Sequence, residues 1–174
     1  LDGNSLGKLP LKAKENVSML MQEQWGENLI RSWNDHWLDL PKRLARKLGH
    51  ILNAKENEIT VGESTSVNLY KLVQALVHSG KYGNQLITDS LNFPTDNYIL
   101  EGIAQKQRSP PPLLVEYSTD LEADLDRLKN TIKEQAGIIC LSLVSYKSAY
   151  LYPMQDLNAW AENHQSIVVW DFGQ

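Results

Sequence analysis

The stretch Gly137-Ile-Ile-Cys-Leu-Ser-Leu-Val144 is a short apolar run with the length of a buried β-strand. Helical patterns flank it at Glu122–Gln135 and Gln155–Asn163, and another apolar run follows at Ser166–Trp170. In the upstream helix the large apolar residues fall on one face and the charged residues elsewhere. Two strands joined by a helix predict a βαβ unit, in which the strands are parallel and the crossover is right-handed.

The same alternation of strand and helix extends upstream from this unit. Three further apolar runs predict strands at Glu58–Val61, Gln85–Thr88 and Leu113–Tyr117. Between them, apolar residues at helical spacing predict helices at Val67–Val77 and Thr95–Gln105. We therefore predict an α/β fold, built on a mostly parallel sheet with flanking helices.

The beginning of the chain has a different sequence pattern, with apolar residues at helical spacing. From Pro10 to Leu29 apolar residues recur at steps of three and four, which predicts one amphipathic helix. Pro41 suits the first turn of a second helix that ends near Leu52. We expect a helical segment over residues 1–56 and the α/β layer over residues 57–174.

Composition excludes several classes of protein. The chain has 174 residues, enough for one domain with a full core, and a net charge of −4. That charge gives no reason to expect a nucleic acid or an anionic membrane as partner, and no apolar run approaches the ~20 residues of a membrane helix. The single cysteine, Cys140, cannot form an internal disulfide, and we expect a small buried hydrophobe in a cytoplasmic protein. The N-terminus lacks the regions of a signal peptide and an initiator methionine, so we expect a cut edge there.

The junctions between strands and helices are the candidate sites. Gly62-Glu-Ser-Thr-Ser-Val67 brings hydroxyl groups to a helix start, where free N–H groups bind phosphate. Ordinary capping of the helix is the simpler explanation of these residues when they are taken alone. Phe93, in Asn92-Phe-Pro-Thr-Asp96, could stack on a flat ring or pack in the core. Asp171 closes an apolar run, where a carboxylate can hold a cationic ring nitrogen or simply begin a turn.

Other familiar motifs are missing from the sequence. The four histidines show no metal-ligand spacing, and no metal site is expected. No glycine-rich dinucleotide fingerprint, Walker loop or G-x-S-x-G elbow is present. These absences argue against dehydrogenases of the Rossmann type, NTPases and esterases.

The order of five short blocks carries more information than any one of them. The chain opens with Leu1-Asp-Gly-Asn-Ser-Leu-Gly7. There follow in order Ile30-Arg-Ser-Trp-Asn34 with His36-Trp37, Ser64-Thr-Ser-Val-Asn68, Asn92-Phe-Pro-Thr-Asp96 and Val169-Trp-Asp171. Across nearly the whole chain these blocks resemble the kynureninase family in sequence and in order.

The resemblance implies a partial large domain of a fold-type-I enzyme that depends on pyridoxal 5′-phosphate (PLP). Kynureninases are cytoplasmic homodimers that hydrolyse L-kynurenine or 3-hydroxykynurenine to an anthranilate and L-alanine, in tryptophan catabolism and NAD biosynthesis. The resemblance assigns the cofactor phosphate to Thr65 and Ser66, and stacking on the ring to Phe93. It places Asp96 near the ring hydroxyl and Asp171 at the protonated ring nitrogen. It assigns the substrate pocket to Ser5, His36 and Trp37.

The sequence also departs from the family pattern. A histidine usually stands where this chain has Gln174, and a glycine where it has Ala149. Lys147 does not match the lysine that forms the Schiff base with the cofactor, which the resemblance places beyond residue 174 together with the arginine for the substrate carboxylate. We therefore expect the chain to be inactive by itself. Two alternatives stay open: another fold-type-I enzyme, such as a class-V aminotransferase or cysteine desulfurase, and a non-catalytic remnant that acts as an interaction protein.

Overall fold

The computed structural model describes residues 7–173 of the chain. Two residues singled out in the sequence, Ser5 and Gln174, lie outside the described residues. The chain divides into two compact units, with the boundary between Gly62 and Glu63. Each unit has its own architecture.

Unit 1 is a succession of helical segments. They are α1 (Leu11–Met19), the π-helix η1 (Leu20–Glu27), the 3₁₀ turn η2 (Leu29–Arg31), the π-helix η3 (Trp33–Trp37), α2 (Leu40–Leu52) and the 3₁₀ turn η4 (Glu56–Glu58). The helix expected from Pro10 is thus present, although its second half widens to π geometry after Met19. As expected, α2 carries Pro41 in its first turn, and it ends at Asn53 in the left-handed conformation typical of a helix C-terminus.

The strand predicted at Glu58–Val61 is wrong, because the structure has a turn there. The backbone N–H of Lys55 donates to the Glu58 carboxylate at 2.8 Å, and the N–H of Glu58 donates to the Lys55 carbonyl at 3.0 Å. These local hydrogen bonds compete with strand pairing for the same backbone groups. Residues 59–63 then run on to α3 without joining the sheet that the structure describes.

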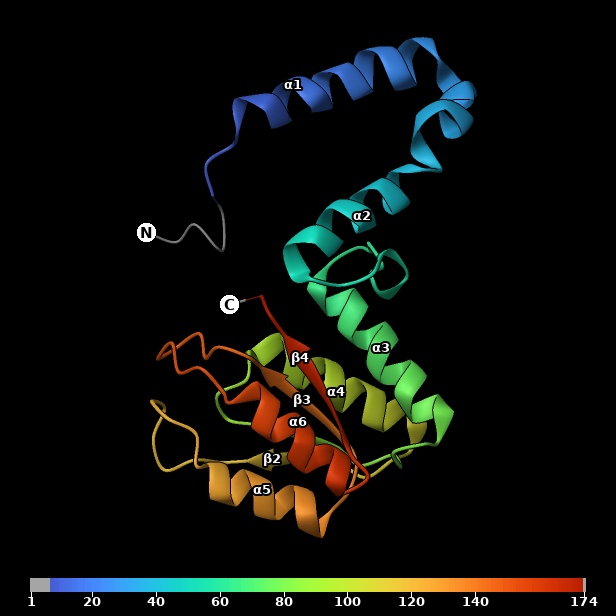
Figure 1. Ribbon diagram of the computed structural model, residues 1–174. Coiled ribbons are helices and arrows are strands. Elements are labelled where there is room, and N and C mark those ends of the chain that lie inside the picture. Colours follow the sequence, from blue (N-terminus) through green and yellow to red (C-terminus); the bar gives the residue numbers. More distant parts are fainter. Residues whose placement is uncertain (1–6, 174) are drawn as a thin grey trace. The chain divides into compact units, whose positions relative to one another are not determined.

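Unit 2 contains the predicted parallel sheet (Figure 1). Its strands are β1 (Leu86–Asp89), β2 (Leu113–Val115), β3 (Ile138–Ser142) and β4 (Ile167–Asp171), in the order β2-β1-β3-β4. Every neighbouring pair is parallel. The helices are α3 (Thr65–Ser79), α4 (Pro94–Gln107), α5 (Leu125–Glu134) and α6 (Met154–Asn163). The predicted fold class, a mostly parallel sheet with flanking helices, is therefore confirmed.

The two central strands have helices on both faces. Leu86, Ile138 and Cys140 pack in a cluster with α3 and α4, whereas Ile87 and Ile139 pack in a cluster with α5 and α6. Successive side chains of a strand point to opposite faces, so burial on both faces makes β1 and β3 apolar up to their polar carboxyl ends. This explains why the strands appear in the sequence as unbroken apolar runs. No helix among residues 7–173 is long and apolar enough to cross a membrane.

Candidate functional site

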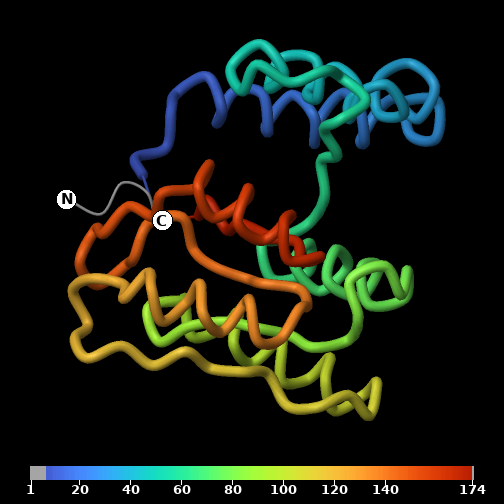
Figure 2. Tube along the Cα trace, turned by 60° about the horizontal axis from the view of Figure 1, so that its bottom comes forward, coloured from blue at the N-terminus to red at the C-terminus, as the bar shows by residue number. Residues whose placement is uncertain are grey.

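The carboxyl ends of the strands form the candidate site. β1, β3 and β4 end at Asp89, Ser142 and Asp171, and Ser142 lies beside Asp171 in the register of the two strands. In both views the loop after β3, in orange, lies at the same end of unit 2 as the end of β4 (Figures 1 and 2). Crevices at the carboxyl ends of strands are the usual ligand sites of open α/β sheets.

Asn92 fixes the loop that follows β1. Its side chain is 3% exposed and accepts hydrogen bonds from the Ser142 hydroxyl at 2.7 Å and from the backbone N–H of Phe93 at 3.0 Å. Its amide donates to the Thr88 hydroxyl at 3.0 Å and to the carbonyl of Cys140 at 3.2 Å. The loop that carries Phe93 is therefore tied to the end of β3.

Phe93 is half-buried immediately before α4, and Tyr146 stands against it from the loop after β3. The two ring centroids are 5.2 Å apart and the planes meet at 77°, an edge-to-face contact. Phe93 is thus held by an aromatic neighbour at the carboxyl edge of the sheet.

Asp96 and Asp171 are brought together from the first turn of α4 and the end of β4. Asp96 is 3% exposed in the first turn of α4, and Asp171 is half-buried at the end of β4. Burial, together with the smaller effect of the nearby charge of Asp171, raises the pKa of Asp96 to about 6. Within residues 7–173 neither carboxylate has a cationic partner, and the side chain of Asp96 accepts no hydrogen bond. Two such carboxylates can stabilise a cation placed between or beside them.

Thr65 and Ser66 form the first turn of α3, which begins on the side toward which β4 points (Figure 1). Ser64 caps this helix, because its hydroxyl accepts a hydrogen bond from the N–H of Val67 at 3.3 Å. The capping interpretation thus holds for Ser64, while the hydroxyls of Thr65 and Ser66 make no hydrogen bond within the described residues. No hydrogen bond there joins Thr65 or Ser66 to Phe93, Asp96 or Asp171.

Two of the residues that the resemblance assigns to the substrate pocket belong to the other unit. His36 and Trp37 lie in unit 1, both half-buried. The indole N–H of Trp37 donates to the Gln24 side chain at 2.8 Å, and its ring meets Trp33 edge to face at 6.0 Å. Trp37 therefore contributes to the packing of unit 1 itself.

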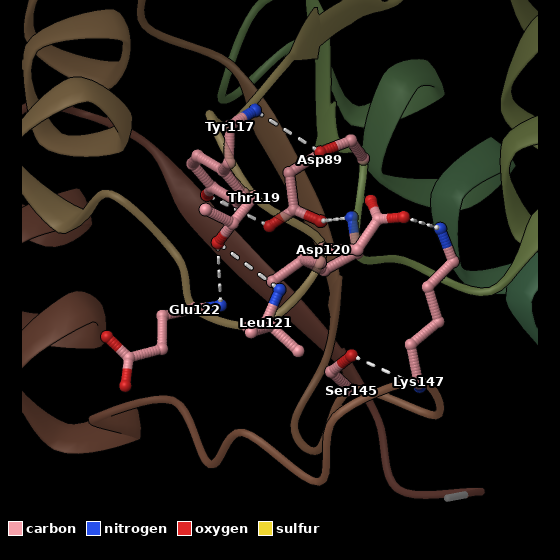
Figure 3. A network of polar contacts seen from close by, with 10 residues as sticks. Asp89, Tyr117, Thr119, Asp120, Leu121, Glu122, Ser145 and Lys147 are labelled. Carbon is pink, nitrogen blue, oxygen red and sulfur yellow. Dashed lines mark hydrogen bonds and ion pairs between the residues drawn. The ribbon is translucent and has the colours of Figure 1, made fainter.

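The sequence did not point to a buried carboxylate at the end of β1. Asp89 is 1% exposed and accepts a hydrogen bond from the Tyr152 hydroxyl at 2.6 Å. It accepts a second from the Tyr117 hydroxyl at 3.0 Å (Figure 3). Burial raises the pKa of the Asp89 carboxyl, and the tyrosine hydrogen bonds oppose that rise. Ser142 was also missed. A polar residue at the carboxyl end of an apolar run is the signal that could have indicated both.

Comparisons with known proteins place this geometry in context. No family model matches the chain. Kynureninases from Pseudomonas fluorescens and Deinococcus radiodurans are 34% and 36% identical to it, in matches that cover 98% of the chain and 41% of each relative. The kynureninase of Burkholderia mallei is 32% identical with the same coverage. The chain thus spans about two fifths of the length of the curated relatives it matches.

The fold is shared with solved structures of lower sequence identity. A C-DES mutant with glycine covalently linked to its PLP cofactor superposes with a TM-score of 0.80 at 19% identity, over 98% of this chain and 46% of that one. A cysteine desulfurase from Thermococcus onnurineus has a TM-score of 0.72 at 19% identity, over 98% of this chain and 42% of that one. At these identities the likeness concerns the fold, which covers less than half of each neighbour. By sequence, the chain is related over nearly its whole length to the kynureninases.

Proposed function

We propose that unit 2 supplies part of the PLP-binding face of a kynureninase-like enzyme. The whole protein would hydrolyse L-kynurenine or 3-hydroxykynurenine to an anthranilate and L-alanine, in tryptophan catabolism, as a homodimer. Sequence similarity to kynureninases along 98% of the chain supports the family part of this proposal. The part that concerns the cofactor depends on the carboxyl edge of the sheet.

The observation that carries the proposal is the pair Asp96 and Asp171. Asp96 is a buried carboxylate whose pKa is raised to about 6, and it lies beside a second carboxylate. Because no cationic side chain within residues 7–173 neutralises this pair, the site lacks a positive charge. The protonated nitrogen of a pyridine ring is such a charge, and its planar ring would suit the exposed side of Phe93. The residues present therefore fit the cofactor.

Each residue has a distinct task in this arrangement. Asp171 holds a proton at the ring nitrogen, because an ionised carboxylate there favours the charged form of the ring. Asp96 lies close to Asp171 and binds near the ring hydroxyl. Phe93 offers a flat apolar surface that orients the ring. Thr65 and Ser66, with the free N–H groups at the start of α3, bind the phosphate.

When bound, PLP supplies a ring that withdraws electrons from the α-carbon of an amino-acid substrate. The residues of this chain would keep the ring protonated and aligned.

Titration with pyridoxamine 5′-phosphate tests the binding part of the proposal. This amine cannot form a Schiff base with surface lysines, so its binding reports the non-covalent site alone. We expect one saturable site by calorimetry, weakened by Asp171→Asn. Asp156→Asn, an exposed aspartate in the first turn of α6, is the matched control and should leave binding unchanged. Absence of saturable binding to the native chain, or equal binding by Asp171→Asn, would contradict the proposal.

A further inference from the structure

Asp89 is a buried carboxylate to which the proposed function gives no task. Its Oδ1 accepts the backbone N–H of Leu91 at 2.9 Å, and its Oδ2 accepts both tyrosine hydroxyls. Within residues 7–173 no lysine, arginine or histidine pairs with it. Three donors and no counter-ion indicate that its task is to hold neighbouring groups in place.

The three donors belong to three different loops at the carboxyl edge of the sheet. Leu91 lies in the loop after β1, and Tyr117 lies two residues beyond the end of β2. Tyr152 closes the loop after β3. The N–H of Tyr117 also donates to the Ser90 hydroxyl at 3.3 Å, which reinforces the link between the first two loops. One side chain therefore ties together the segments that follow three parallel strands.

The loop after β3 connects Tyr152, which Asp89 binds, to Tyr146. The N–H of Tyr152 donates to the Leu143 carbonyl at 3.0 Å, and Val144 pairs with Leu151 in an antiparallel bridge. Residues 143–152 thus form a hairpin whose base is held through Tyr152 and whose tip carries Tyr146. At the tip, Lys147 pairs with Asp120 from the loop after β2 at 3.1 Å (Figure 3). That pair is exposed, and such pairs contribute little on their own.

We infer that Asp89 is a positioning residue that sets the contact between Phe93 and Tyr146. It fixes the base of the loop that carries Phe93 through Leu91, and the base of the hairpin that carries Tyr146 through Tyr152. The contact of the two rings depends on both anchors at once. The consequence for a bound ring rests on the proposed function, in which Phe93 is the stacking surface.

Tyr152→Phe is the sharpest test, because it removes one hydroxyl and keeps the ring. Tyr150→Phe is the matched control. Tyr150 lies in the same hairpin, its ring centroid is 5.2 Å from that of Tyr152, and its hydroxyl makes no hydrogen bond within the described residues. Asp89→Asn provides a second perturbation of the same network. Tyr146→Ala is the reference variant, because it removes the aromatic ring that contacts Phe93.

The first readout is the chemical shift of the Phe93 ring protons in the ligand-free chain. We expect Tyr152→Phe and Asp89→Asn to move these shifts toward the Tyr146→Ala values, and Tyr150→Phe to leave them unchanged. The second readout is affinity for pyridoxamine 5′-phosphate, which should fall about threefold to tenfold in both variants, the range that one hydrogen bond contributes.

A merely structural role predicts a different result. In that case Tyr152→Phe lowers the melting temperature but leaves the Phe93 shifts and the affinity at their native values, and this outcome overturns the inference. If the native chain binds no pyridoxamine 5′-phosphate, the proposed function fails, while the Phe93 shifts still decide the positioning role of Asp89.

Discussion

Asp96 lies close enough to Asp171 for the charge of Asp171 to add to the effect of burial on the pKa of Asp96. The two residues are 75 positions apart and come from the start of α4 and the end of β4, so only the parallel sheet brings them together. The state in which both carboxylates are ionised is therefore unfavourable in the ligand-free chain. A measurable dependence of stability on pH follows.

Asp96→Asn should stabilise the ligand-free chain at neutral and higher pH. The pKa of Asp96 is raised from 3.8 to about 6 in the folded chain, so the folded state binds this proton more tightly and ionisation opposes folding. That cost is full above pH about 7 and disappears as the pH falls toward 4. After allowance for solvent screening we expect a gain of about 1 kcal/mol at pH 8, measured by urea denaturation, and none at pH 4.

The control for this measurement is Asp156→Asn. Asp156 is the third residue of α6, as Asp96 is of α4, so both substitutions remove the same favourable interaction with a helix start. Asp156→Asn should destabilise slightly, by about 0.5 kcal/mol, at pH 8. Equal pH profiles for the two variants would refute the coupling.

Asp171→Asn should reduce turnover far more than stability in a chain extended to the length of its relatives. The neutral amide cannot keep the ring nitrogen protonated, and such a loss in a dry site commonly costs about 3 kcal/mol, roughly a hundredfold in rate. Steady-state kinetics on kynurenine at saturating cofactor would measure this. Near-native turnover with an unchanged melting temperature would make Asp171 a turn residue.

Ser66→Ala should weaken cofactor affinity and spare turnover once the cofactor is saturating. It removes one of several contacts to the phosphate and leaves the N–H groups of the α3 start in place. Kinetics over a range of PLP concentrations separate the two effects. A loss of turnover that excess PLP does not restore would assign Ser66 a different role.

Ala149→Gly should stabilise the chain. Ala149 has φ of 57°, in the left-handed region that favours glycine, and its N–H donates to the Ser145 carbonyl at 2.8 Å. Relief of this conformation should raise the free energy of unfolding by about 0.5–1 kcal/mol. Ala159→Gly, inside α6, should lower it by about 1 kcal/mol and serves as control. Destabilisation by both variants would show that Ala149 is not strained.

Unit 1 should promote self-association through its exposed apolar side chains. Trp25, Leu29 and Ile30 are 62%, 59% and 74% exposed, and with Trp33 and Trp37 they line a groove of about 340 Å³. Uncovered apolar patches of this kind drive association. Sedimentation velocity should show a concentration-dependent increase in mass that Trp25→Ser and Ile30→Ser together reduce. A monodisperse monomer at high concentration would exclude this expectation.

The sequence predicted the parallel sheet well, because strands buried on both faces are apolar along most of their length. Gly137–Val144 and Ser166–Trp170 were found within one or two residues of β3 and β4. The family resemblance alone assigned Asp96 and Asp171 to one ring, and the shared carboxyl edge of parallel strands explains why the two residues lie close together. Glu58–Val61 failed because a hydrogen bond to the Glu58 side chain closes a turn, which hydrophobicity does not report.

The polar contacts behind the site could not be predicted. The hydrogen bonds from Tyr117 and Tyr152 to Asp89 span 28 and 63 residues, and that from Ser142 to Asn92 spans 50. A tyrosine in a loop and an aspartate at a strand end have many possible partners. Only the packed sheet selects one of them.

The five paired residues of β3 and β4 limit where the chain can change in length. Ser142 lies opposite Asp171 because Ile138 lies opposite Ile167, so one residue inserted or deleted within β4 would turn Asp171 to the other face of the sheet. The exposed residues Ser118 to Glu122, between β2 and α5, pair with no strand and can accommodate such changes. Insertions and deletions among functional relatives should therefore gather in that loop and be absent from Ile167–Asp171.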